Sequence, residues 1–378
     1  MSYVGRVRDL SLDENIKNMK QIFYYAFIIL LFMSCNQESV VKEAPIRYVK
    51  PGKTVSVEKD PAFAPDFEQT LTCTDVEIFN DSVMLLYDMI GTNKNICFFK
   101  AYSLDDYSYK GEYITYGRGP DELLAPALSG TIRSGKDGTD CGYIYDGMLG
   151  KSFCFDINRS IKENETILQE LTKLPANTIY AFPYLDSLQF IMNIENDRVL
   201  YHILDTQSNA IDTFDMFRDD ISAENCISGL ANCVEINNDK GMAAMLMLAI
   251  PQVNFLNLQD GKVKSVAVSK QYKNWKNILY TGNDMNSLMN SMRYYIDAAS
   301  TRDHILSIYT NNTIGQSING GGQAPHIHIF DWEGNFLYDL AVKENISRID
   351  YDSQRKHLYG LDVNEGKIYR YDMSGILD

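Results

Sequence analysis

A short pattern that occurs twice near the C-terminal end constrains this chain more than any other feature. Residues 327–334 read Ile-His-Ile-Phe-Asp-Trp-Glu-Gly, and residues 368–375 read Ile-Tyr-Arg-Tyr-Asp-Met-Ser-Gly. Apolar residues alternate in both copies, which predicts a strand, and the Asp-x-x-Gly ending predicts a tight turn. One strand and its turn cannot bury both of their own faces, so the pattern indicates a fold built from stacked copies.

Apolar strands that end in an aromatic residue or a leucine, followed by Asp, Asn or Ser, recur along the chain. They end at positions 102–103, 155–156, 204–205, 256–257, 330–331 and 371–372. Intervals of roughly 40 to 50 residues with several strands each are typical of propeller blades. We therefore predict an all-β fold, a six-bladed β-propeller over residues 51–378, with each mark closing the third strand of a blade.

The predicted propeller also has two insertions in one blade and lacks the fourth strand of its last blade. The longest interval contains residues 270–292, where we expect a short helix, and a Gly- and Asn-rich loop at residues 311–325. Six residues follow Asp372, too few for a fourth strand. Because an open ring would leave sheet edges exposed, we predict that the alternating segment 54–58 completes the last blade.

The N-terminal segment resembles an export signal. An apolar run at residues 22–33 follows Lys17 and Lys20 and is followed at once by Ser34 and Cys35. This run has the length of the apolar core of a signal peptide, and it is short for a membrane span. A buried strand or a short anchor helix is the alternative interpretation.

A small residue followed by Cys resembles the lipobox of bacterial lipoproteins, which makes Cys35 the predicted lipid attachment site. Phe32 departs from the usual Leu of that pattern. We expect residues 1–18 to be an upstream mis-assigned start, residues 19–35 a lipoprotein signal peptide and lipobox, and residues 36–50 a tether. These features predict lipid anchoring in the cell envelope of a Gram-negative bacterium, at its outer membrane.

Charge and cysteine usage restrict the partners. The net charge of −15 repels phosphate backbones and argues against nucleic-acid binding. Cys226 and Cys233 are the pair to test for a disulfide, whereas the other cysteines after Cys35 are predicted to be buried thiols. No cysteine and histidine spacing suggests a zinc site.

Residues 117–123, Gly-Arg-Gly-Pro-Asp-Glu-Leu, and residues 327–371 resemble the TolB-like six-bladed propeller lipoproteins and, more loosely, NHL-type propellers. The first stretch is similar to the family's link between blades one and two. The resemblance covers residues 50–378 and implies the fold, but it implies no activity, because propellers carry out unrelated functions. Some propeller hydrolases hold calcium in the central channel.

Arg118, Asp121 and Glu122 are the candidate ligand-binding residues. The alternative is that the glycines and the proline of this segment only shape a crossing between blades. His326 and His328 face the same side of a strand but lack a third ligand, so no metal site is predicted.

No catalytic constellation is found, so enzymatic activity is not predicted. The leading hypothesis is an exported, membrane-anchored binding propeller that recognises a glycan, a peptide or a protein partner on its loop face. The alternatives are a calcium-dependent hydrolase or lactonase, with calcium as its cofactor, and a non-catalytic scaffold of an envelope complex. An inward ring of three or more carboxyl or amide side chains would favour calcium.

Overall fold

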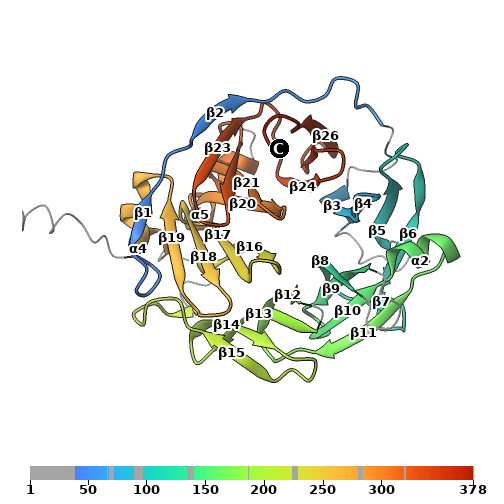
Figure 1. Ribbon diagram of the computed structural model, residues 1–378, viewed down its shortest axis with the longest axis horizontal. Coiled ribbons are helices and arrows are strands. Elements are labelled where there is room, and N and C mark those ends of the chain that lie inside the picture. The colour runs from blue at the N-terminus through green and yellow to red at the C-terminus, as the bar shows by residue number, and fades with distance from the viewer. Residues whose placement is uncertain are drawn as a thin grey trace, which may run out of the picture. The chain divides into compact units, whose positions relative to one another are not determined.

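The computed structural model describes residues 39–65, 67, 72–88, 97–133, 140–185, 187–223, 229–279, 284–318 and 321–377. From Val40 onward these residues form one compact unit, in which six small sheets are arranged in a ring (Figure 1). The prediction of an all-β, six-bladed propeller is confirmed. The predicted signal peptide, Cys35 and the start of the predicted tether lie outside the described residues.

The first three blades are built from consecutive antiparallel strands, apart from the short β7, which pairs in parallel with β6, and the innermost strand comes first in each. Blade one contains β3 (Cys73–Phe79), β4 (Val83–Asp88), β5 (Cys97–Ser103), β6 (Tyr109–Tyr116) and the short β7 (Glu122–Leu123). Blade two contains β8 (Pro126–Arg133), β9 (Asp140–Asp146), β10 (Lys151–Phe155) and β11 (Leu168–Lys173). Blade three contains β12 (Thr178–Tyr184), β13 (Leu188–Glu195), β14 (Arg198–Leu204) and β15 (Ala210–Phe214).

The other three blades follow the same order. Blade four contains β16 (Asn232–Asn237), β17 (Met242–Met247), β18 (Gln252–Asn257) and β19 (Val263–Ala267). Blade five contains β20 (Met292–Ser300), β21 (His304–Thr313), β22 (His326–Asp331) and β23 (Phe336–Ala341). Blade six contains β24 (Arg348–Asp352), β25 (His357–Asp362) and β26 (Lys367–Asp372).

Short helices lie in the connections. They are α2 (Ile157–Glu163), the 3-10 helix η2 (Lys270–Asn274), α4 (Trp275–Leu279), α5 (Met285–Met289) and α6 (Ile314–Ile318). The expected helix in the 270–292 insertion is therefore present, and α6 interrupts what we expected to be a loop at 311–325. None of the described helices is long and apolar enough to cross a membrane.

All six predicted strand ends are confirmed, and hydrogen bonds explain the pattern. The Asp or Asn at the end of the strand, or directly after it, accepts hydrogen bonds from backbone N–H groups of the next turn. Asp331 Oδ1 accepts from Asn335 N at 2.7 Å, Asp205 Oδ1 from Asn209 N at 2.9 Å, and Asn257 Oδ1 from Gln259 N at 2.8 Å. A short polar side chain at this position fixes the turn that leads to the outermost strand.

The innermost strands define two faces of the ring. Neighbouring innermost strands run in the same sense, because Asp75 and Ile78 of β3 contact Arg348 and Asp350 of β24 in that order. We call the face where these strands begin the top face; it also carries the links between blades and the loops between second and third strands. The bottom face carries the turns between first and second strands.

The N-terminal segment differs from the prediction in two ways. β2 (Lys53–Ser56) pairs in parallel with β23 of blade five, so the prediction that segment 54–58 completes the last blade is wrong. β1 (Ile46–Tyr48) pairs in parallel with β19 of blade four, so the predicted tether is wrong from Val40 onward. We call residues 40–60 the N-terminal strap. Val40 and Val41 are buried, because this strap covers the outer edges of two blades.

The N-terminal strap contacts the last blade through Lys59 and Asp60, directly after the segment 54–58 that was predicted to do so. Lys59 bridges Tyr371, and the Asp60 carboxylate forms an ion pair with the Arg370 guanidinium. The same guanidinium lies over the Phe63 ring and donates a hydrogen bond to the Tyr107 hydroxyl at 2.7 Å. These contacts connect blade six to the chain that enters blade one, and they close the ring without a complete fourth strand.

One disulfide, Cys141–Cys154, joins β9 to β10 within blade two. The prediction that these two residues are free thiols is wrong, because the hairpin brings their Cα atoms to 5.7 Å, within the usual range for a bridge. Cys233 is a free thiol. Cys226, the other member of the pair named for testing, lies outside the described residues.

Candidate functional site

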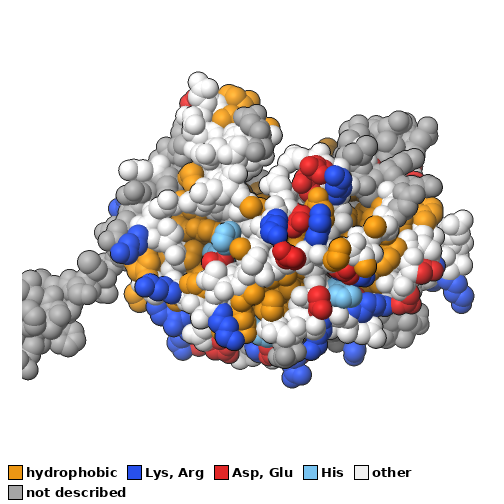
Figure 2. All heavy atoms as spheres, turned by 90° about the horizontal axis from the view of Figure 1, so that it is seen from above, with side chains coloured by type: hydrophobic (Ala, Val, Ile, Leu, Met, Phe, Trp, Pro, Cys, Tyr) orange, Lys and Arg blue, Asp and Glu red, His pale blue; other side chains and the backbone are white. Residues whose placement is uncertain are grey.

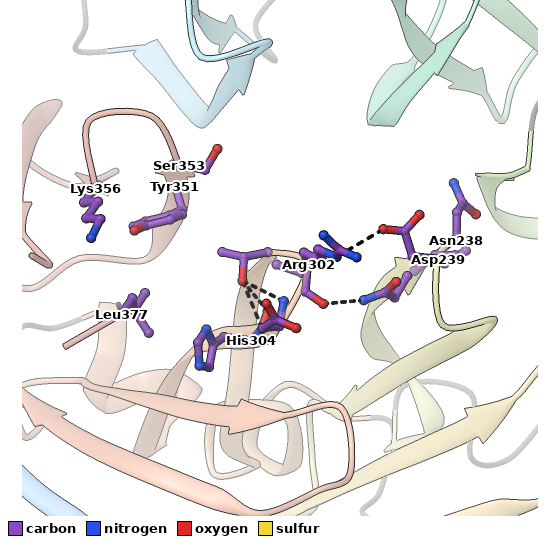
Figure 3. A pocket seen from close by; sticks show the side chains of 13 residues that line it. Asn238, Asp239, Arg302, His304, Tyr351, Ser353, Lys356 and Leu377 are labelled. Carbon is purple, nitrogen blue, oxygen red and sulfur yellow. Dashed lines mark hydrogen bonds and ion pairs between the residues drawn. The ribbon is translucent and has the colours of Figure 1, made fainter.

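A pocket of about 540 Å³ opens on the bottom face, where blades four, five and six meet. Three turns supply most of its wall: the turn after β16, the turn after β20 and the turn after β24 (Figure 3). The lining residues are Ile236, Asn237, Asn238, Asp239, Ser300, Thr301, Arg302, Asp303, His304, Tyr351, Ser353, Lys356 and Leu377.

The two sides of the pocket differ in character. Figure 3 shows Tyr351, Ser353 and Lys356 of blade six on one side and Arg302 with Asp239 on the other. The Arg302 Nε atom lies 3.5 Å from Asp239 Oδ2, so the guanidinium is held toward blade four. Both side chains are largely exposed, which leaves them accessible to a ligand.

Hydrogen bonds fix the backbone of the turn after β20. The Thr301 hydroxyl oxygen accepts from the backbone N–H groups of Asp303 at 3.2 Å and His304 at 2.9 Å. The Asn237 side-chain amide donates to the Arg302 carbonyl at 2.8 Å. A turn that is fixed in this way presents its side chains without a large ordering cost when a ligand binds.

The lining has no net charge. Two acids, Asp239 and Asp303, balance two bases, Arg302 and Lys356. Burial lowers the pKa of His304 below its usual value, so this imidazole is neutral at pH 7. The remaining polar groups are amides and hydroxyls, which both donate and accept hydrogen bonds.

Beside the pocket, the innermost strands of four blades carry a cluster of acids that we call the acid cluster. It consists of Asp75 and Glu77 on β3, Glu235 on β16, Asp297 on β20 and Asp350 on β24. Arg348 on β24 lies next to it, with its Nε atom 3.7 Å from Asp75 Oδ1. The Ser300 hydroxyl, which lines the pocket, donates to Glu235 Oε2 at 2.7 Å and so joins the two regions.

Burial is the first cause of unusual pKa values in the acid cluster. It raises the pKa of Glu235 to about 8 and that of Asp350 to about 7. Burial also raises the pKa of Glu77 and Asp297 well above the usual values, and the neighbouring carboxylates add to both shifts. At neutral pH, part of the cluster therefore carries protons.

The acid cluster does not fit a calcium site, although it meets the criterion of three inward carboxyl groups. Four of the five carboxylates already accept hydrogen bonds. For example, Asp297 Oδ2 accepts from Ile349 N at 2.7 Å, and Asp350 accepts from the backbone N–H groups of Ile78 and Tyr351. Arg348 supplies a competing positive charge. Within the described ranges no three His, Cys, Asp or Glu side chains are placed to hold one metal ion.

The predicted binding residues lie on the opposite face. Residues 117–123 form the link from β6 to β8 on the top face, where Glu122 Oε2 accepts from Gly119 N at 2.7 Å. A Cβ atom at Gly117 would lie 1.9 Å from the Glu122 carboxylate, which shows how tightly the link folds around that side chain. Glu122 therefore shapes the crossing between blades, while Arg118 and Asp121 are exposed. Their role in binding stays a prediction.

The two histidines of β22 take part in packing and in an ion pair. His326 Nδ1 lies 2.6 Å from Asp339 Oδ1, and His328 is buried against the Tyr309 ring at 4.1 Å. Burial lowers the pKa of His328 well below its usual value, so it is neutral. These partners account for both side chains without a metal.

Sequence reasoning did not find the pocket residues Asn238, Arg302 and Ser353. Each lies in the turn after an innermost strand, so a strand count that also ranked those turns by exposed polar residues would have found them. The acid cluster had a clearer signal, because Asp75 and Glu77 alternate on one strand and Arg348 and Asp350 alternate on another. Alternation in an inner strand places both residues of each pair on the same side.

No family model and no curated protein matches this chain. Among solved structures, it is similar to a Bacteroides fragilis protein that is inferred to be exported, with a TM-score of 0.50, 11% identity, and coverage of 84% of this chain and 99% of that one. It is also similar to a DUF4221 family member from Bacteroides vulgatus, with a TM-score of 0.49, 9% identity, and coverage of 89% and 98%. At such low identity the likeness concerns the fold alone. The TolB-like resemblance stays a prediction.

Proposed function

We propose that this chain is an exported, lipid-anchored β-propeller that binds a neutral, hydroxyl-rich ligand, an oligosaccharide, in the bottom-face pocket. The observation that carries the proposal is the lining of that pocket, in which charges balance and amide and hydroxyl groups dominate. A phosphate or a strongly cationic ligand would need an excess of one charge, which this lining does not offer.

The chemistry of the lining suits a sugar, whose hydroxyls both donate and accept hydrogen bonds. Asn238 and Ser353 lie on opposite sides of the pocket. Asn238 Oδ1 already accepts from Leu185 N, which leaves its NH2 group as a donor, and the Ser353 hydroxyl already donates to Asp81, which leaves its oxygen as an acceptor. The Arg302 guanidinium offers several donors in one plane, and its pairing with Asp239 keeps it extended along the wall. Ile236, Tyr351 and Leu377 add apolar atoms to the lining, although Tyr351 and Leu377 are largely buried in the core.

Three observations support export, and the first of them also supports lipid attachment at Cys35. The apolar run and the lipobox-like Ser34–Cys35 pair provide the sequence signal. The Cys141–Cys154 disulfide is typical of an oxidising compartment outside the cytoplasm. The Bacteroides fragilis neighbour is also inferred to be exported. Anchoring in the outer membrane of a Gram-negative bacterium belongs to the proposal and rests on the lipobox pattern.

A binding screen tests the proposed ligand class. The full chain is applied to an array of bacterial, plant and host glycans, and hits are titrated by calorimetry with wild type, Arg302→Ala and Asn238→Ala. Loss of either side chain should weaken binding at least about tenfold, because a bound hydroxyl loses its partner. The matched control is Lys262→Ala, which removes an exposed side chain in the turn after β18, outside the pocket.

Two results would contradict this function. One is a ligand that binds equally well to wild type and to both pocket variants. The other is an array without hits, together with capture of a peptide or a protein in the same pocket.

A further inference from the structure

The described chain begins on the top face of the propeller. The Val40 N–H donates to the Tyr272 hydroxyl at 2.9 Å, and Tyr272 belongs to η2, in the link from blade four to blade five. The Val40 carbonyl accepts from Arg218 N at 3.1 Å, in the link from blade three to blade four. Links between blades lie on the top face, so this is the face from which the chain continues toward its N-terminus.

The proposed lipid attachment site is only five residues away from Val40. Five steps of at most about 3.5 Å allow Cys35 to lie no farther than about 17 Å from Val40. This short reach follows from the strap, because the residues that the sequence predicted as a tether are strands and buried side chains. A lipid on Cys35 would therefore hold the top face close to the bilayer.

The same face carries a knob made of α5 and α6. The two helices pack on each other: a Cβ atom at Gly315 would lie 3.1 Å from the Met289 carbonyl oxygen. The start of β20 pairs with the end of β21, Met292 with Thr313, so the knob stands where both strands reach the top face. In the space-filling view a knob with apolar side chains projects from one face of the ring (Figure 2).

The knob exposes three large apolar side chains among uncharged polar ones, and the Asp284 carboxylate lies at its edge as the N-cap of α5. Met285, Ile318 and Leu288 expose 70%, 63% and 41% of their surface, and no residue of either helix is buried. Residues 285–291 and 311–318 contain no Asp, Glu, Lys or Arg, in a chain in which 22% of residues are charged. Exposed apolar side chains on helices without charged residues lower the cost of entering the lipid interface, and the Asp284 carboxylate would have to stay at its aqueous side.

We propose that the knob docks into the membrane surface, with Met285, Leu288 and Ile318 in the lipid interface and the bottom-face pocket directed away from the bilayer. The proposal rests on the lipid anchor in the proposed function. β20 spans nine residues from the knob to the pocket, so the two sites lie on the order of 25 Å apart along the axis. The orientation would leave the pocket open to large ligands.

Tryptophan probes test this orientation. The full, lipid-modified chain is reconstituted in vesicles of phosphatidylethanolamine and phosphatidylglycerol with brominated acyl chains, which quench nearby tryptophan. Met285→Trp and Ile318→Trp report the knob. The controls are Ile211→Trp on β15 and Gln259→Trp in the turn after β18, both exposed. The native Trp275 and Trp332 are buried and give a constant background.

We expect bromination to remove about half of the added fluorescence at both knob positions and almost none at the controls, because interfacial apolar groups enter about 5–10 Å. Vesicle flotation of the wild type measures separately whether the lipid anchor holds the chain on the membrane. A chain that floats without quenching at the knob would overturn the docking while the anchor stands. A chain that does not float would overturn the anchor and, with it, the docking. A blue shift at the knob that needs no lipid and grows with protein concentration would instead identify a second copy as the occupant and overturn the proposal.

Discussion

Four blades of the inner ring are built differently from the other two. In blades four, five, six and one, the innermost strands carry the acid cluster, and its carboxylates accept hydrogen bonds from the neighbouring blade, as Asp297 does from Ile349 N. The innermost strands of blades two and three, β8 and β12, contain no Asp or Glu. There the blades are joined by tyrosine hydroxyls, which donate from Tyr143 to Gln189 and from Tyr145 to the Thr178 carbonyl, both at 2.6 Å.

This difference separates two ways of joining blades. Carboxylates can bridge to a neighbouring backbone, but their burial makes the junction depend on protonation. Tyrosine hydroxyls and the disulfide of blade two do not titrate between pH 5 and pH 8.5 in this way: burial raises the pKa of Tyr143 and Tyr145 further above their usual value. The junction of blades two and three should therefore contribute a stability that is independent of pH, whereas the junctions that contain the acid cluster should not.

The largest effect is expected from removal of the disulfide. A Cys141→Ala/Cys154→Ala double variant should lower the free energy of unfolding by about 3 kcal/mol, because the bridge closes a loop of 13 residues. Urea denaturation at pH 5 and pH 8.5 measures the loss, which should be equal at both. Cys97→Ala, which removes a free thiol on β5, serves as the control. A loss that changes with pH would contradict the claim that this part of the ring has a stability independent of pH.

Glu235→Gln should have a smaller, pH-dependent effect. Burial, with a smaller contribution from Asp350, holds the pKa of Glu235 near 8, whereas the unfolded chain releases this proton near the usual value of 4.5. The folded state thus becomes less stable as the pH rises from 4.5 to about 8. The glutamine cannot ionise and keeps an acceptor for the Ser300 hydroxyl. We expect the variant to be more stable than the wild type by about 2 kcal/mol at pH 8.5, and equal to it near pH 4.5.

Urea denaturation across this pH range checks the expectation for Glu235→Gln, and the exposed Glu333→Gln is the control. An equal difference at every pH would show that Glu235 acts only through packing. A variant that is less stable than the wild type at pH 8.5 would mean that the charged carboxylate stabilises the fold. Either result would contradict the claim that protonation of the acid cluster controls the stability of the junctions between its blades.

The sequence was informative where one residue determines a local structure. Asp331 and Asp372 mark the ends of third strands, because their side chains bond to the turns that follow. The partner of segment 54–58 depends instead on which outer edge lies nearest in the closed ring, and alternation along a strand does not encode that choice. The pocket was missed for the same reason: Asn238, Arg302 and Ser353 are far apart in sequence and meet only when three blades are in place.

The smallest effect is expected at the junction between blades two and three. Gly130 on β8 has φ +121°, and a Cβ atom there would lie 3.3 Å from Cγ of Pro183 on β12. Gly130→Ala should lower the free energy of unfolding by about 1 kcal/mol, because alanine is strained at this φ and crowds the next blade. Gly321→Ala, with no atom within 4 Å of the added Cβ, should change it by less than about 0.5 kcal/mol. Denaturation at pH 5 and pH 8.5 should give the same loss for Gly130→Ala. A loss confined to pH 8.5 would mean that the acid cluster also controls this junction. The stability of all six blades would then depend on pH together.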